Sequence, residues 1–211
     1  MKVETVTGPA LLPHVSALAR LRGAVFAEWP YLYQSPPGEE ERYLRHYIEG
    51  EGAAIILARD GVEIVGAATC QPMAATHGPV RACFEAAGRN PTDYAYFGES
   101  VLLPAYRGQG IGVAFFAARE AHAASLGLPC STFCAVVRNV NDPRRPASYT
   151  PLDGFWGKRG YTHHPELSCV FDWTEIGDGK PSPHALSFWI KQLGRDRPGA
   201  LPPGHPSQAP T

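Results

Sequence analysis

The sequence lacks the features that mark membrane-spanning, secreted or nucleic-acid-binding proteins. No apolar run approaches the length needed to cross a bilayer, and the start, MKVETVTGPA, lacks the basic-then-apolar pattern of a signal peptide. Lysine and arginine number 19 against 20 aspartate and glutamate residues, so the formal net charge is −1. A chain without a basic excess lacks the usual source of affinity for nucleic acid or anionic lipid. We therefore expect a cytoplasmic protein with neither nucleic-acid nor membrane partners.

Cysteine is also scarce, and its five positions are not spaced in pairs. They are Cys70, Cys83, Cys130, Cys134 and Cys169. An odd count without paired spacing is typical of buried or free thiols in a reducing compartment, not of a disulfide framework. The adjacent pair His163 and His164 would point to opposite faces of a strand, which disfavours a shared metal ion. The sequence therefore predicts a protein that needs no metal.

The chain of 211 residues suffices for one α/β domain with its own core, which we expect to span residues 1–194. The remainder, 195–211, is rich in proline and glycine, and its composition predicts a disordered tail. The expected strands are 3–7, 53–59, 62–71, 94–103, 131–137, 167–173 and 185–190. The expected helices begin near residues 11, 36–39 and 111, with a short one at 80–87 inside an irregular insertion, 72–93. A strand followed by a glycine loop, a helix and another strand predicts a partly parallel sheet.

The most informative segment is 106–112, YRGQGIG, which lies between an expected strand and an expected helix. Glycines at alternate positions let the backbone approach a ligand closely, and the N-terminus of the following helix favours an anion. Arg107 adds donors that suit phosphate. Two other phosphate loops do not fit, because no Lys-Ser or Lys-Thr follows and the glycines run G-x-G-x-G instead of G-x-G-x-x-G. Tight packing without a ligand is the remaining alternative.

The stretch 102–112, LLPAYRGQGIG, resembles the signature V-x-P-x-Y-R-G-x-G-I-G of the GNAT N-acetyltransferases. A weaker match is 155–161, FWGKRGY, which is similar to the Y-x-K-x-G-F segment of that family. The resemblance extends loosely over 1–192, because the expected element order is also that of the family. It implies a GNAT fold, with a mixed central sheet of about six to seven strands, flanking helices, and two splayed parallel strands that hold the acyl-CoA.

The resemblance also implies acetyl-CoA as co-substrate and places it on particular residues. The pantetheine arm would face the backbone of Ser100, Leu102 and Leu103, and an N–H near Leu102 would polarise the thioester carbonyl. The pyrophosphate would lie on the N–H groups of the glycine loop. The implied binding set is Ser100, Leu102, Leu103, Arg107, Gly108, Gln109, Gly110, Ile111, Gly112 and Asn139.

For catalysis, the resemblance points to Glu99 as the base that deprotonates the acceptor amine, directly or through water. A lone glutamate among small and apolar strand residues supports this role, although an ordinary cleft carboxylate is the alternative. The tyrosine that protonates the leaving thiolate in many relatives is replaced here by Trp156, which cannot donate in that role. Tyr149 and Tyr161 are substitutes, of which Tyr149 enters the candidate catalytic set. A third possibility is that the acid is absent, because coenzyme A thiolate is a tolerable leaving group.

The acceptor of such an enzyme usually enters beside the first two helices and the final hairpin. Phe26, Trp29, Tyr31 and Tyr33 lie at that junction, where they could line a pocket for a small, partly apolar amine. Packing is the alternative for at least two of them. The sequence thus predicts an acetyl-CoA-dependent N-acetyltransferase that acts on a small-molecule amine by direct attack, with homodimer formation left open. The alternatives are a non-catalytic acyl-CoA-binding or sensing module and an interaction domain whose glycine loop only packs.

Overall fold

The computed structural model describes residues 1–76 and 78–194, so the tail predicted at 195–211 lies outside the described residues. These residues form an eight-stranded sheet in the order β1-β2-β3-β4-β6-β8-β7, with β5 paired to β3. The strands are β1 (Lys2–Val6), β2 (Ala54–Asp60), β3 (Glu63–Pro72), β4 (Tyr94–Tyr96), β5 (Ser100–Leu102), β6 (Cys130–Val136), β7 (Thr162–Trp173) and β8 (Ser182–Gln192). Strands β4 and β6 run parallel, and the other paired strands run antiparallel. The predicted mixed α/β sheet is confirmed.

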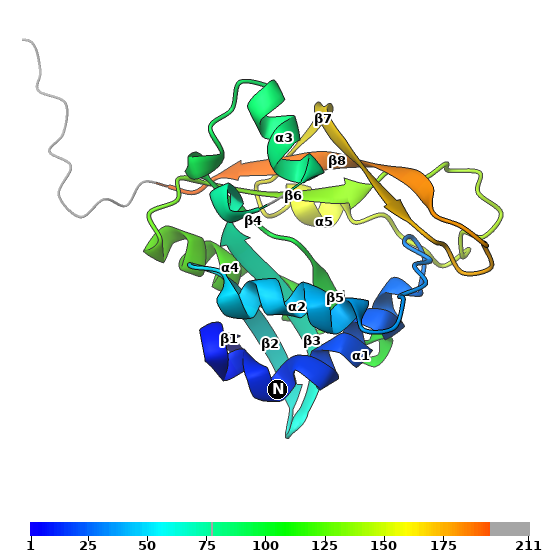
Figure 1. Ribbon diagram of the computed structural model, residues 1–211, viewed down its shortest axis with the longest axis horizontal. Coiled ribbons are helices and arrows are strands. Elements are labelled where there is room, and N and C mark those ends of the chain that lie inside the picture. The colour runs from blue at the N-terminus through cyan, green and yellow to red at the C-terminus, as the bar shows by residue number, and fades with distance from the viewer. Residues whose placement is uncertain (77, 195–211) are drawn as a thin grey trace, which may run out of the picture.

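Helices cover both faces of this sheet (Figure 1). They are α1 (Val15–Phe26), α2 (Glu39–Glu49), α3 (Pro79–Ala86), α4 (Ile111–Ser125) and α5 (Asp153–Gly157). Strand β2 is buried on both faces: Ile55 and Leu57 belong to the core cluster under α1 and α2, whereas Ile56 and Ala58 belong to the cluster under α4. A third cluster joins α3 to β4, β6, β7 and β8. Within the described residues, no helix is both long enough and apolar enough to span a bilayer.

The prediction of a single strand over 94–103 is wrong, because the chain forms two strands there, β4 and β5, with a break between them. Gly98 lies at the break, where an added Cβ would come within 2.5 Å of the Tyr47 hydroxyl and 2.9 Å of Thr69 Oγ1. Before the break, the Phe97 N–H donates to Thr132 on β6 (2.8 Å); after it, Glu99 exchanges hydrogen bonds with Thr69 on β3 (3.0 Å each). The split gives the sheet eight strands, one more than the upper expectation of seven.

Smaller differences concern where elements begin. A 3-10 helix, Gly8–His14, contains Pro13 and precedes α1, where the sequence predicted one helix from Leu11. Further 3-10 helices lie at Met73–Ala75, Pro91–Asp93 and Pro104–Tyr106. Strands β7 and β8 form a longer hairpin than expected, and a register shift interrupts their pairing between His164 and Ser168.

Candidate functional site

The site begins at an opening between β5 and β6. The parallel pairing of β4 with β6 runs from Tyr94 and Cys130 to Tyr96 and Thr132. Beyond that point β5 pairs with β3, while β6 continues to Val136 along β8. Two strands that begin side by side therefore separate at Gly98, which is the splayed arrangement that the sequence predicted for an acyl-CoA cleft.

The ladder between β5 and β3 decides which backbone groups face this opening. Antiparallel neighbours exchange hydrogen bonds at alternate residues. Glu99 and Leu103 are directed to β3, because Thr69 N–H donates to Glu99 (3.0 Å) and Leu103 N–H donates to Val65 (3.0 Å). The alternate residues Ser100 and Leu102 therefore turn their N–H groups away from β3, toward the opening.

The prediction for Leu103 needs a correction. Its N–H is used by β3, and its carbonyl accepts from the Tyr106 N–H (3.0 Å). Both backbone groups are thus occupied within the fold. The carbonyl of Leu102 is also engaged, because it accepts from Nε of Arg107 at 3.1 Å. The N–H groups of Ser100 and Leu102 remain as the donors that the ladder directs to the opening.

The glycine loop leads directly into the N-terminus of α4, as predicted. Gly108 and Gly110 have φ values of +75° and +83°, a region that side chains other than glycine rarely adopt. Gly110 is the N-cap of α4, the first turn holds no acidic residue, and no side chain caps the helix. Its first N–H groups therefore carry an uncompensated partial positive charge, which fits a pyrophosphate. Gln109 has its amide on the Ala105 carbonyl (3.0 Å), and Ile111 is buried.

Arg107 is held at the edge of this loop by two partners. In addition to the Leu102 carbonyl, its guanidinium contacts the Glu28 carboxylate at 2.7 Å. The side chains of Arg107 and Glu28 are 47% and 39% exposed, so this ion pair is screened by water and weak. An anion at the loop can therefore compete with Glu28 for the guanidinium.

Gly112 is needed for close packing and not, like Gly108 and Gly110, for a positive φ. It lies in the first turn of α4, and an added Cβ would come within 3.1 Å of the Phe155 ring on α5. Phe155 in turn packs edge-on against Phe116 of α4. The third glycine of the motif thus lets α4 and α5 approach each other beside the loop.

We expect Gly112→Val to lower the free energy of unfolding by about 1–3 kcal/mol, because the larger side chain overpacks the contact with Phe155. Thermal or chemical denaturation would measure the loss. Gly23→Ala in α1 is the matched control, because no atom lies within 4 Å of its added Cβ and its φ is ordinary. That control should gain about 0.5–1 kcal/mol from helix propensity. A stable Gly112→Val protein would show that α5 is free to move away.

The carboxylate of Glu99 is not free. It pairs with the guanidinium of Arg22 on α1, and the same guanidinium pairs with Glu40 on α2. The three side chains are only 7–9% exposed. Arg22 also lies over the Tyr43 ring, 3.8 Å from its centroid. One cation therefore serves two buried carboxylates, so the formal charge of the three side chains is −1.

Sequence reasoning missed Arg22 and Glu40, although a signal for Arg22 was present. The apolar residues that predicted α1 include Leu18 and Val25, and Arg22 follows Leu18 by four residues on the same face. A charged residue on a core-facing stripe needs a buried partner. That partner is a pair of glutamates from two distant segments, which spacing cannot identify.

The aromatic segment, 26–33, approaches the Glu99 cluster through Phe26, whose ring centroid lies 5.2 Å from the guanidinium of Arg22. Phe26 and Tyr31 pack edge-on with centroids 4.9 Å apart, and Tyr31 lies 6.1 Å from Trp173 of β7. Burial raises the pKa of the Tyr31 hydroxyl and also that of Tyr33. The indole N–H of Trp29 is buried without a hydrogen-bond partner among the residues that the structure describes. Packing thus accounts for Phe26 and Tyr31, whereas Trp29 retains an unused donor.

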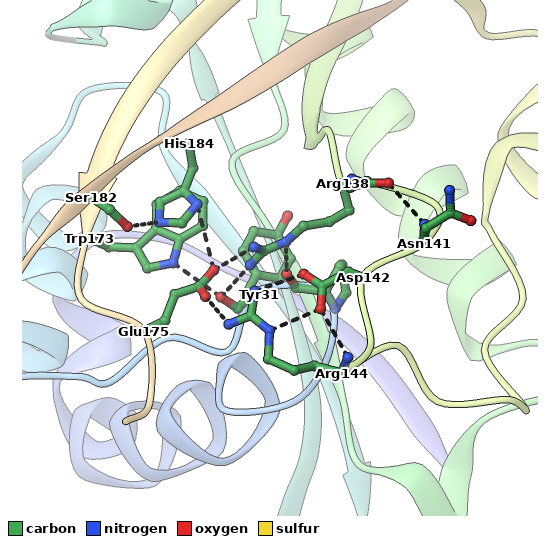
Figure 2. A network of polar contacts seen from close by, with 11 residues as sticks. Tyr31, Arg138, Asn141, Asp142, Arg144, Trp173, Glu175, Ser182 and His184 are labelled. Atoms are coloured by element: carbon green, nitrogen blue, oxygen red, sulfur yellow. Dashed lines mark hydrogen bonds and ion pairs between the residues drawn. The ribbon is translucent and has the colours of Figure 1, made fainter. Parts of the chain in front are cut away.

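The long link between β6 and α5, residues 137–152, is fastened over this segment by one carboxylate (Figure 2). Glu175, between β7 and β8, pairs with both Arg138 and Arg144 of the link. Arg138 also donates to the carbonyls of Pro30 (2.5 Å) and Tyr31 (2.9 Å). We call Arg138, Arg144 and Glu175 the clasp, because they join the link, the aromatic segment and the final hairpin.

Charge pairing stabilises the clasp. Burial alone would raise the pKa of Glu175, but hydrogen bonds from Arg144 and Arg138 hold that pKa below its usual value. Arg144 also contacts Asp142 through two guanidinium nitrogens (3.0 and 2.7 Å) and lowers the pKa of Asp142 to about 2. His184 lies 3.6 Å from the Glu175 carboxylate and stacks on Trp173. The sequence contained no pattern that predicted this arrangement.

The structure places the candidate acids in different surroundings. Tyr161 is buried with its hydroxyl on Ser131 (2.8 Å) and Glu120 (3.1 Å), and Trp156 packs against Phe133 and Trp189. Both therefore belong to the core. Tyr149 lies on the link, half-buried, with its ring edge-on to Trp29 at 6.0 Å. Burial raises the pKa of Tyr149, so its hydroxyl keeps its proton at neutral pH.

Asn139 is occupied locally. Its side-chain oxygen accepts from the Asn141 N–H at 2.9 Å, and its backbone carbonyl accepts from the Asp142 N–H at 3.1 Å. The residue is exposed at the start of the link. These two bonds use only its oxygen atoms, so the amide nitrogen Nδ2 is the group left for the predicted contact with the donor. In residues 1–76 and 78–194, no group of three or more His, Cys, Asp or Glu side chains is placed to hold a metal ion.

Comparisons with known proteins agree with this geometry. The profile of the acetyltransferase (GNAT) family matches residues 18–147, more than half of the chain. A comparison with curated protein sequences finds no match. Among solved structures, a ribosomal-protein-alanine N-acetyltransferase from Brucella melitensis is 15% identical with a TM-score of 0.61, over 92% of this chain and 100% of that chain.

Two further solved structures hold acetyl-CoA or coenzyme A. YncA, a putative acetyltransferase from Salmonella typhimurium with acetyl-CoA, is 12% identical with a TM-score of 0.58, over 97% of this chain and 100% of that chain. The PaiA N-acetyltransferase from Thermoplasma acidophilum in complex with coenzyme A is 12% identical with a TM-score of 0.54, over 91% of this chain and 99% of that chain. At these identities the similarity concerns the fold.

Proposed function

The chain belongs to the acetyltransferase (GNAT) family, as its glycine-loop signature predicted, and we propose that it transfers the acetyl group of acetyl-CoA to the amine of a small molecule. The observation that carries this proposal is the opening between β5 and β6 directly beside an uncapped helix N-terminus. A strand with free N–H groups next to an anion site suits a long ligand with an amide arm and a pyrophosphate. Acetyl-CoA supplies the activated acyl group, and the chain supplies binding and proton transfer.

We assign roles to the residues as follows. The N–H of Leu102 binds the pantetheine arm, the N–H of Ser100 faces the thioester end of the ligand, and residues 107–112 bind the pyrophosphate. Glu99 accepts the proton of the attacking amine or orients that amine. The net negative charge of the cluster of Arg22, Glu40 and Glu99 attracts an amine that arrives protonated. Tyr149, the proposed acid, has its ring edge-on to that of Trp29. The indole N–H of Trp29 is available to donate to an oxygen of the acceptor.

A calorimetric titration with acetyl-CoA tests the donor site. We expect Arg107→Ala to weaken binding about 10-fold and Arg107→Glu to weaken it further, because charge-assisted contacts to phosphate are lost or reversed. Arg81→Ala is the matched control: Arg81 is an arginine of similar exposure, 43%, paired with Glu85 at 2.8 Å on α3. Glu28→Gln, which frees Arg107, should bind acetyl-CoA at least as tightly as the wild type.

The same titration can refute the proposal. An unmodified protein that does not bind acetyl-CoA would rule out acetyl transfer and leave the glycine loop as a packing element. Binding that is equal in the wild type and both Arg107 variants would place the donor elsewhere. If binding is found, thiol release in the presence of candidate amines separates an enzyme from a binding module.

A non-catalytic acyl-CoA sensor is the second candidate, and one observation favours it. The carboxylate of Glu99 is engaged by the guanidinium of Arg22 instead of being free to face an incoming amine. A sensor would bind acetyl-CoA and release no thiol with any amine. An enzyme would release thiol with at least one small amine from a screened set.

A further inference from the structure

Arg119 on α4 is a buried arginine directly beneath the point where β4 and β5 separate. It is 2% exposed, and its guanidinium contacts two aromatic rings, 4.4 Å from the centroid of Phe97 and 4.6 Å from that of Phe116. Its Nε donates to the Phe115 carbonyl at 3.3 Å. One of its terminal nitrogens, Nη2, is buried and has no hydrogen-bond partner among the described residues.

This guanidinium carries its charge without a paired carboxylate. Burial lowers its pKa to about 10, which leaves it protonated at neutral pH. None of the ion pairs in the described part of the chain includes Arg119. A buried cation without a counter-ion is unfavourable for stability, and apolar packing alone would be served better by an uncharged side chain.

The other terminal nitrogen contacts the strand beside the opening. Nη1 of Arg119 donates to the Glu99 carbonyl at 3.3 Å, and the Thr69 N–H donates to the same oxygen at 3.0 Å. That carbonyl belongs to the peptide unit whose N–H is on Ser100. Hydrogen bonds to a peptide oxygen, above all from a charged donor, polarise the N–H of the same peptide. The Ser100 N–H points away from β3 into the opening.

We propose that Arg119 is a positioning residue for the proposed acetyl transfer: it fixes and polarises the peptide between Glu99 and Ser100, so that the Ser100 N–H donates to the carbonyl oxygen of the bound thioester. The inference rests on the proposed function. A donor fixed in advance and aimed at developing negative charge accelerates acyl transfer. Arg119 itself does not touch the substrate, because the peptide lies between them.

Isotope-edited infrared spectroscopy of acetyl-CoA labelled at the thioester carbonyl tests this directly. Binding to the wild type should move the carbonyl stretch to lower wavenumber. The shift should decrease in the order wild type, Arg119→Lys, Arg119→Gln, Arg119→Met, because lysine keeps the charge, glutamine keeps only a donor and methionine keeps neither. We expect Arg119→Met to lose about half of the shift or more and to lower kcat about 10-fold, with little change in acetyl-CoA affinity.

Leu193→Ala is the control for lost packing, because Leu193 is a buried member of the core cluster that contains Phe97 and Phe116. It should lose stability but keep the full carbonyl shift. If Arg119→Met does not fold, the comparison of the lysine and glutamine variants decides, since equal shifts in those two overturn the inference. Equal shifts in the wild type and Arg119→Met overturn it as well, while the proposed function stands. A wild type that does not bind acetyl-CoA overturns both.

Discussion

Replacing Arg22 with methionine is expected to lower the free energy of unfolding by about 3–5 kcal/mol at neutral pH. The guanidinium is shared by Glu40 and Glu99, and all three side chains are nearly inaccessible to water. Removing the cation leaves two buried carboxylates without a counter-charge, which costs more than the ion pairs themselves contribute. Contact with the Tyr43 ring is lost as well. Chemical denaturation of the purified variant would measure the loss.

Arg20→Met is the matched control for this prediction. Arg20 lies on the same helix but is exposed, so the same substitution should change stability by no more than about 0.5 kcal/mol. Adding Glu40→Gln to Arg22→Met removes one of the stranded charges and should restore part of the stability. A loss that is equally small at Arg22 and Arg20 would mean that the glutamates are hydrated or protonated in the native protein.

Replacing Glu99 with glutamine is expected to lower kcat about 10²- to 10⁴-fold, because the amide cannot accept the proton of the attacking amine. Stability should be largely kept, since glutamine still accepts a hydrogen bond from Arg22 and the cluster then holds one cation and one anion. The affinity for acetyl-CoA should also be kept, because the glycine loop lies elsewhere. Steady-state assays of thiol release, together with calorimetry, would separate these quantities.

Glu40→Gln provides the comparison that isolates catalysis. Glu40 is equally buried and contacts the same guanidinium, but it lies on α2 and not on the strand segment beside the opening. Its substitution changes the charge of the cluster in the same way and should leave kcat within about 10-fold of the wild type. An equal loss of kcat in both variants would assign the effect to the charge of the cluster and remove Glu99 as the base.

Local sequence signals predicted the elements that carry the donor site. The Asp60-Gly61 pair marked the hairpin of β2 and β3, and YRGQGIG marked the turn into α4. Such signals depend on backbone conformation at a few adjacent residues, which local sequence encodes. The break inside 94–103 had a local signal as well, because an isolated glycine in a strand favours an irregularity. Gly98 was that glycine, although the reason for it, the hydroxyl of Tyr47, lies on α2.

Long-range partners could not be predicted in the same way. The family resemblance suggested Glu99, but its partner Arg22 comes from a helix 77 positions earlier. In the clasp, Glu175 pairs with arginines more than 30 positions earlier in the chain. The prediction for Leu103 was wrong because ladder alternation depends on register, which the sequence did not specify. These features follow from packing between elements.

The clasp ties the link, the segment with Tyr31 and the final hairpin to one another. A link taken from a related protein and grafted between β6 and α5 would leave Glu175 buried and unpaired unless it brought two arginines at the positions of Arg138 and Arg144. An exchange of the link alone is therefore expected to destabilise the fold. Matching changes in the segment with Tyr31 and in the final hairpin should restore it.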